Sequence, residues 1–180
     1  MIKYVAILRG INVAGSKPIK MDDLKKMFED LKYKNVRTYI QSGNIFFESD
    51  ITDQGKLENQ ISERILKIFK FEVPVITRNI KELYRILNIN PFLKERNIDI
   101  SKLHVTFLSG IPQPEKINNI QGKNYEADRF IIIDKEIYLY CPGGYGITKL
   151  NNNFFENKLS LKATTRNWKT VLKLIEILEK

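Results

Sequence analysis

Three short polar stretches hold many of the side chains that could contact a ligand: Arg9-Gly10-Ile11-Asn12, Gln41-Ser42-Gly43-Asn44 and Ala163-Thr164-Thr165-Arg166-Asn167-Trp168. Each stretch lies where an apolar segment begins or ends. Each is rich in hydrogen-bond donors and poor in side chains that could act as a general acid or base. This combination favours binding of a ligand over catalysis.

The arginines of these stretches are the residues that could bind an anion. Guanidinium groups bind phosphate and carboxylate through paired donors. We therefore expect Arg9 and Arg166 to bind such a group, with help from the Thr165 hydroxyl and from the helix that follows. The structural alternative is that Asn167 or Thr165 caps this helix and that Arg166 pairs with an acid elsewhere.

Neutral amide side chains accompany the arginines. Asn12, Gln41 and Asn44 offer both donors and acceptors, so we expect them to orient a ligand. The alternative for Asn12 is a local turn next to Gly10. The alternative for the second stretch is a hairpin turn in which Gly43 supplies a positive φ.

A glycine-rich segment, residues 142–149, joins a predicted strand to a predicted helix. Backbone amides at such a junction favour anions, and Lys149 would close the site. Thr148 could equally be a plain N-cap. Ser42 or Lys149 would carry the chemistry of an enzyme acting on a phosphate or acyl substrate, but the sequence offers no activating base for either.

The composition is that of an ordinary globular protein. Of 180 residues, 43% are hydrophobic and 28% are charged. The longest apolar runs are too short to span a bilayer, and the first eight residues resemble a strand rather than a signal peptide. We therefore expect a cytoplasmic location without a membrane partner.

The chain has a single cysteine, Cys141, and a single histidine, His104. These counts exclude an intrachain disulfide and zinc sites built on Cys/His clusters.

The chain is basic, with a net charge of +9. An excess of lysine and arginine can mark a phosphate-rich partner, so a nucleotide or nucleic acid is the partner that we expect. The alternative is a compositional bias, because Lys, Ile and Asn are together favoured in AT-rich genomes. No basic run of the kind that marks a binding tail is present.

Apolar periodicity predicts the elements that position these stretches. In the first half it predicts strands at 3–8, 36–41, 44–48 and 73–77, and amphipathic helices at 21–32 and 54–70. The order β-α-β-β-α-β is the ferredoxin-like arrangement.

In the second half, His104 lies within a predicted strand, on the face opposite Leu103 and Val105. We expect this histidine to be structural rather than catalytic.

The predicted elements of the second half follow a similar but less regular order. This half contains a linking helix from Ile80, a strand near 103–107, a hairpin across Asp134-Lys135, and two later helices. No convincing sequence repeat is evident, and this half ends in a helix. The predicted fold class is α+β, with two ferredoxin-like (βαββαβ-type) subdomains, the second imperfect, and an extra C-terminal helix. The predicted boundaries are 1–78, a linking helix and loop at 79–101, and 102–180.

Four motifs, taken in order, resemble those of a bacterial conserved-domain family of unknown function: Arg-Gly-Ile-Asn at 9–12, Tyr39-Ile40-Gln41-Ser42-Gly43-Asn44, Thr148-Lys149-Leu150 followed by Phe154-Phe155-Glu156, and Ala163-Thr164-Thr165-Arg166-Asn167-Trp168. The resemblance runs nearly end to end. It implies an α+β fold of two ferredoxin-like subdomains and implies no reaction. It suggests that the four motifs are held together for a shared purpose.

The leading hypothesis from the sequence is a small binding protein for a phosphorylated ligand, either a nucleotide or nucleic acid. Two other classes stay open. One is the enzyme described above, and the other is a protein-interaction module that uses exposed strand edges or the last helix. The residues point to no particular cofactor or protein partner.

Overall fold

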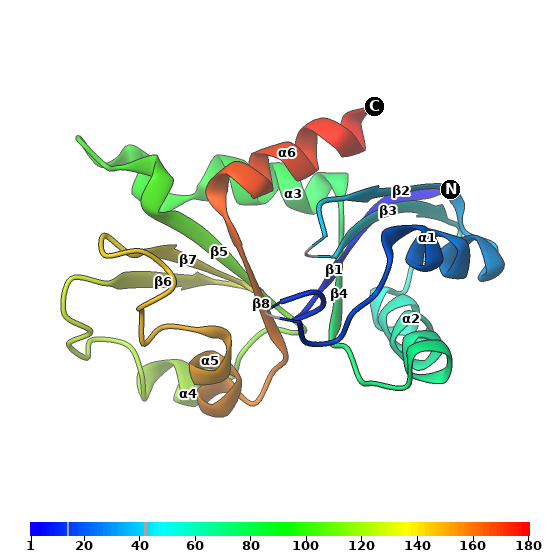
Figure 1. The fold of residues 1–180 in the computed structure, drawn as a ribbon. Coiled ribbons are helices and arrows are strands. Elements are labelled where there is room, and N and C mark those ends of the chain that lie inside the picture. Colours follow the sequence, from blue (N-terminus) through cyan, green and yellow to red (C-terminus); the bar gives the residue numbers. More distant parts are fainter. Residues whose placement is uncertain (14, 42) are drawn as a thin grey trace. The chain divides into compact units, whose positions relative to one another are not determined.

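The computed structural model describes residues 1–13, 15–41 and 43–180. The chain divides into two compact units, Met1–Leu83 with Glu176–Lys180, and Tyr84–Ile175. Each unit contains a four-stranded antiparallel sheet with helices packed on it (Figure 1). The predicted α+β class with two ferredoxin-like subdomains is therefore confirmed, and the boundaries predicted near residues 78 and 101 stay predictions.

The first unit has the element order predicted from the sequence. Its sheet order is β2-β3-β1-β4, and α3 starts directly after β4. The elements are β1 (Ile2–Leu8), α1 (Met21–Asp30), β2 (Lys34–Tyr39), β3 (Asn44–Ser49), α2 (Gln54–Phe69), β4 (Val75–Asn79) and the start of α3 (Ile80–Ile89), which continues into the second unit.

Helices α1 and α2 cover one face of this sheet (Figure 1). Because side chains alternate along a strand, Tyr4, Ala6 and Leu8 of β1 share that face and belong to one apolar core with Phe28 of α1 and Ile61 of α2. Fully burying a side chain such as Leu8 contributes about 1.5–3 kcal/mol. This core fixes the ends of β1 and α1, and thereby the loop that joins them.

The second unit repeats the same sheet order, β6-β7-β5-β8, with α4 and α5 below the sheet in Figure 1. Its elements are η1 (Pro91–Lys94), η2 (Ile100–Lys102), β5 (Leu103–Leu108), α4 (Pro114–Asn118), β6 (Arg129–Ile133), β7 (Glu136–Tyr140), α5 (Asn152–Leu159), β8 (Ala163–Asn167) and α6 (Trp168–Glu179), the last of which crosses the division between the units. None of the described helices is long and apolar enough to cross a bilayer.

The sequence analysis predicted no strand just before the last helix, but residues 163–167 form strand β8, which pairs with β5. Thr164 and Thr165 suit a strand because they are β-branched. Thr165 and Asn167 obscured this signal, since both residue types also favour the N-cap of a helix. With β8 in place, the second unit has all four strands of the ferredoxin-like arrangement.

The sheet register also reveals a repeat that sequence inspection missed. Arg78 lies opposite Val5 of β1, and Arg166 lies opposite Val105 of β5. In both units this arginine is flanked by Thr and Asn and is followed by a helix. In both, its Nη1 donates to the carbonyl of the preceding threonine, at 2.8 Å from Thr77 O and 3.0 Å from Thr165 O.

The first strand of each unit ends in the same way. The sequences there are Leu8-Arg9-Gly10-Ile11 and Leu108-Ser109-Gly110-Ile111. The amide of Leu8 donates to Gly43 O at 2.8 Å, and that of Leu108 donates to Lys135 O at 2.8 Å. The two units therefore share one order of strands and helices, with equivalent contacts at the ends of their first and last strands.

Candidate functional site

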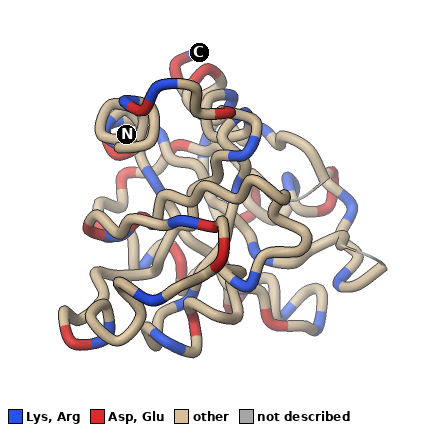
Figure 2. Tube along the Cα trace, turned by 90° about the vertical axis from the view of Figure 1, so that its left-hand side faces the viewer, with Lys and Arg blue, Asp and Glu red and all other residues tan. Residues whose placement is uncertain are grey.

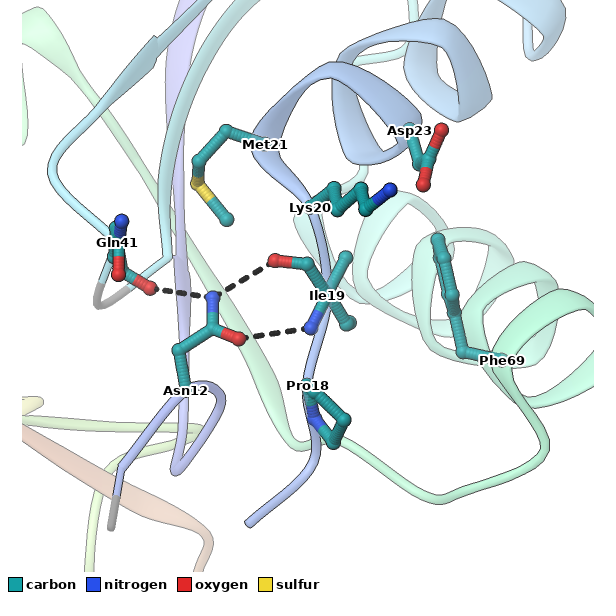
Figure 3. Close-up of a pocket in the computed structure, with 8 residues that line it drawn as sticks. All are labelled: Asn12, Pro18, Ile19, Lys20, Met21, Asp23, Gln41 and Phe69. Carbon is teal, nitrogen blue, oxygen red and sulfur yellow. Dashed lines mark hydrogen bonds between the residues drawn. The ribbon is translucent and has the colours of Figure 1, made fainter. Parts of the chain in front are cut away.

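Asn12 organises the loop between β1 and α1. Its Nδ2 donates to Ile19 O and to Gln41 O, both at 2.9 Å, and its Oδ1 accepts from Ile19 N at 2.8 Å (Figure 3). Its backbone is left-handed, with φ of 55°, which asparagine tolerates better than most residues. The side chain thus ties the segment before α1 to the turn after β2.

This tie borders a pocket in the first unit, with a volume of about 430 Å³ (Figure 3). Asn12 and Gln41 lie on one side and Phe69 of α2 lies on the other, with the segment 18–21 between them. The lining residues are Asn12, Pro18, Ile19, Lys20, Met21, Asp23, Gln41 and Phe69. The pocket therefore combines apolar surface with two amides, an ammonium group and a carboxylate.

The first turn of α1 starts at this pocket. Its N-cap residue, Lys20, has an extended backbone and makes no side-chain capping bond. The amides of a first helical turn have no partner within the helix, so they can donate to a ligand. The carboxylates of Asp22 and Asp23 in the same turn oppose the accumulation of negative charge there.

Ile40 holds a left-handed backbone next to Gln41, with φ of 53°, although it is β-branched and 46% exposed. Such a conformation costs about 1–3 kcal/mol and is found where the surrounding structure dictates it. Here it turns the Gln41 carbonyl toward Asn12. Ser42, which was also predicted to contact a ligand, lies outside the described residues.

Asn44 and Arg9 are placed differently from Asn12 and Gln41. Asn44 is 0% exposed, and its Nδ2 donates to Tyr39 O at 3.2 Å across the hairpin. Arg9 is half-buried, and its amide donates to Pro74 O at 3.0 Å. Neither is among the described residues that line the pocket. Gly43 has the positive φ that was predicted, at 81°.

In the second unit, the hydroxyl of Thr165 is the centre of a small polar network. It donates to Asn152 Oδ1 at 2.7 Å and accepts from the Tyr145 hydroxyl at 2.9 Å. The Thr106 hydroxyl lies 2.7 Å away and must donate, because the only proton of Thr165 goes to Asn152. The network joins β5, β8, α5 and the glycine-rich loop, so this hydroxyl has a structural role.

Arg166 is the neighbour of this network on β8. Its Nη1 donates to Thr164 Oγ1 at 3.1 Å and to the Thr165 carbonyl. Burial of the guanidinium lowers the pKa of Arg166 to about 10, and the nearby Tyr145 acts in the opposite direction. The group remains charged at neutral pH. Its predicted contact with an anion stays a prediction.

Two other predicted side chains bind partners within the second unit. Asn167 Oδ1 accepts from Thr170 N at 2.8 Å, which is the capping bond of the structural alternative. Lys149 Nζ lies 2.8 Å from Glu126 Oε1. The hydrogen bond that Lys149 donates to Glu126, together with the negative charge of Glu126, raises the pKa of Lys149. Activation of a lysine nucleophile requires the opposite shift, so this pairing disfavours Lys149 as a nucleophile.

His104 stacks on Tyr145, with ring centroids 5.0 Å apart, and its Nδ1 lies 3.1 Å from Lys102 O. Burial lowers the pKa of His104, although the bond to the Lys102 carbonyl works against this. The folded state therefore binds its proton less tightly than the unfolded state, in which the pKa is about 6.5. Stability should be full above about pH 6.5 and should fall as the pH drops toward the lower folded pKa.

The corresponding measurement is the melting temperature between about pH 7 and about pH 5.5, for the wild type and for His104→Phe. The phenylalanine keeps a ring against Tyr145 and cannot bind a proton. We expect the variant to lose less stability on acidification than the wild type. An equal loss in both proteins would mean that other groups cause the pH dependence.

The predicted site residues fall in both units. The structure joins Asn12 to Gln41 in the first, and Thr165 lies next to Arg166 in the second. Sequence reasoning missed the other residues that line the pocket, chiefly Lys20, Met21, Asp23 and Phe69. One signal was available, because no Ser, Thr, Asp or Asn precedes α1 to cap it.

Comparisons with known proteins agree with this architecture. The chain has the fold of the conserved bacterial protein SP0830 from Streptococcus pneumoniae, with a TM-score of 0.78 and 22% identity over 98% of each chain. It is 27% identical over 92 residues to the uncharacterized protein MJ0889 of Methanocaldococcus jannaschii. This match covers 51% of the chain but 16% of that relative. Residues 1–138 match the model of a protein family of unknown function, DUF1697, and the chain belongs to this family.

Proposed function

We propose that this protein binds a nucleotide in the pocket of its first unit. The observation that carries the proposal is the grouping of Lys20 and the uncapped first turn of α1 with the Gln41 amide and the apolar side chains of Met21 and Phe69. The volume of about 430 Å³ is within the range of about 300–1,000 Å³ that is usual for small-molecule sites.

The phosphate would bind at the start of α1. The Lys20 ammonium group and the first backbone amides of the helix provide positive charge and donors. Asp22 and Asp23 partly neutralise this charge. The balance favours one phosphate group over a di- or triphosphate, because each added phosphate would bring further negative charge close to two carboxylates.

The nucleoside would fill the rest of the pocket. Met21, Phe69 and Pro18 offer apolar surface for the flat face of a base. The exposed side chain of Gln41 can both donate to and accept from the edge of a base. Asp23 can accept hydrogen bonds from sugar hydroxyls.

In this proposal, the residues that the sequence predicted to bind a ligand have different roles. Asn12 builds the pocket, and Gln41 contacts the ligand. Phosphate binding is assigned to Lys20 in place of Arg9 and Arg166. Lysine and arginine are interspersed with acidic residues along the trace in Figure 2.

Isothermal titration with adenosine and guanosine monophosphates tests the proposal, with the nucleosides, inorganic phosphate and a short single-stranded RNA in parallel. We expect Lys20→Ala to weaken binding of a monophosphate about tenfold, since it removes a charged hydrogen bond. Lys26→Ala is the matched control, because Lys26 is an exposed residue of α1 that does not line the pocket.

Three results would contradict the proposal. One is no binding of any monophosphate, and another is equal loss of affinity in the Lys20 and Lys26 variants. The third is tight binding of the RNA with no binding of mononucleotides, which would favour a nucleic-acid function. Hydrolysis of the ligand during the titration would instead support the enzyme hypothesis.

A further inference from the structure

A second pocket, of about 280 Å³, lies in the second unit beside strand β6. It is lined by η1 and the residue after it, by the loop between α4 and β6, and by β6 itself. Its lining residues are Phe92, Glu95, Gln121, Gly122, Lys123, Tyr125, Asp128, Arg129, Phe130 and Ile131. This volume leaves space for a single ring system.

Arg129 forms a fixed wall of this pocket. Its Nη1 donates to Glu95 Oε1 at 3.0 Å and its Nη2 donates to Glu95 Oε2 at 2.8 Å, so both ends of the guanidinium fork are held. The Cζ atom also lies 5.1 Å from the ring of Phe92 and 5.0 Å from the ring of Tyr140. The guanidinium plane is therefore pre-organised, and its charge is balanced by Glu95.

Tyr125 and Phe130 form another wall. Their ring centroids are 5.6 Å apart at an angle of 64°. The Tyr125 hydroxyl donates to Ile120 O at 3.0 Å, and its ring also packs edge-on against Phe154 of α5. These contacts hold the rings in place before any ligand arrives, which lowers the entropic cost of binding.

The polar groups at the pocket select what can bind. The Thr148 hydroxyl donates to Asp128 Oδ2 and so orients this carboxylate. Among the described residues, nothing bonds to the second oxygen, Oδ1, which remains an acceptor. Gln121 adds an exposed amide. The charges of Lys123 and Arg129 are matched by those of Glu95 and Asp128, so no net charge draws in an anion.

We propose that this pocket binds a neutral heteroaromatic ring that carries amino or imino donors, as a nucleobase does. The ring would stack on the fixed aromatic and guanidinium surfaces, and its donors would meet Asp128 and Gln121. A phenyl ring could stack there as well, but it would leave the carboxylate without a donor, and an unpaired polar group disfavours binding. This site is separate from the one proposed in the first unit and does not depend on it.

The test is an NMR titration of the labelled full-length protein with adenosine, guanosine and cytidine, with N-acetylphenylalanine amide as the phenyl probe. We expect at least one nucleoside to shift the amide signals of residues 121–131, and the phenyl probe to leave them unchanged. Asp128→Asn should weaken this nucleoside about tenfold, since it replaces a charged acceptor. Glu126→Gln is the matched control in the same loop, because it is exposed and does not line the pocket.

The two proposals fail separately. Lys20→Ala should leave the shifts at residues 121–131 intact, even if it abolishes nucleotide binding to the first unit. The present proposal is overturned if no nucleoside shifts these signals, if the phenyl probe shifts them equally, or if the Asp128 and Glu126 variants bind alike. A folded spectrum of Asp128→Asn is required for the comparison, and Gln121→Ala, at an exposed position, provides a second variant with the same expected direction.

Discussion

Replacing Asn12 by alanine should destabilise the protein by about 3 kcal/mol and abolish nucleotide binding to the first unit. Three hydrogen bonds depend on this side chain, two to Ile19 and one to Gln41 O. Each contributes about 1 kcal/mol. Alanine is also less tolerant than asparagine of the left-handed backbone at this position.

A series of variants separates these contributions in urea unfolding. Asn12→Gly relieves the backbone cost but loses all three bonds, so it should be less damaging than Asn12→Ala. Asn12→Asp keeps the acceptor for Ile19 N and loses both donated bonds. Asn157→Ala, at an exposed position of α5, should change stability by no more than about 0.5 kcal/mol.

Ligand binding adds a second measurement to this series. Below the melting temperature of Asn12→Ala, the fold persists while the segment before α1 is no longer tied to Gln41. The pocket walls should then move independently, and titration with a monophosphate should give no measurable heat. Wild-type affinity in a destabilised Asn12→Ala protein would show that the tie supports the fold but not the site.

Strong periodic patterns explain why most of the fold could be predicted. The apolar spacing that defines α1 and the short apolar run that defines β3 each depend on neighbours in the sequence, and both elements were predicted to within two residues of their ends. Strand β8 was missed because it is short and because its threonines and its asparagine also favour the N-cap of a helix. Its pairing with β5 provides the missing signal, and that pairing is between residues about 60 positions apart.

The site was less predictable than the fold for a similar reason. Asn12 and Gln41 could be selected because their residue types suggest hydrogen bonding. Lys20 and Phe69 carry no such signal, since a lysine before a helix and a phenylalanine near the end of one are both ordinary. Only the packing of α1 and α2 on one sheet brings them to the same pocket. Thr165 is the opposite case. Its hydroxyl was predicted to contact a ligand, but in the structure it donates a hydrogen bond to a residue of the same unit.

Replacing Gly43 by alanine should have the largest effect on stability of any single methyl addition at a described glycine, at about 2–5 kcal/mol. A Cβ atom there would lie 2.8 Å from Leu8 Cβ and 2.8 Å from Ile11 Cδ1. The Ile11 side chain can rotate, but Leu8 Cβ is fixed to the central strand β1. The φ of 81° adds a second cost, which arises from the backbone of the new residue itself.

Gly10→Ala isolates the backbone cost. Gly10 has a φ of 70°, and nothing lies within 4 Å of the Cβ that alanine would add. It should therefore lose only about 1–2 kcal/mol. The difference in unfolding free energy between the two variants measures the close approach of the hairpin to β1. Equal losses would mean that the hairpin can move away from Leu8, and the bond from Leu8 N to Gly43 O, at 2.8 Å, would then have to break or lengthen. Loss of protection of the Leu8 amide against hydrogen exchange in Gly43→Ala would reveal that movement.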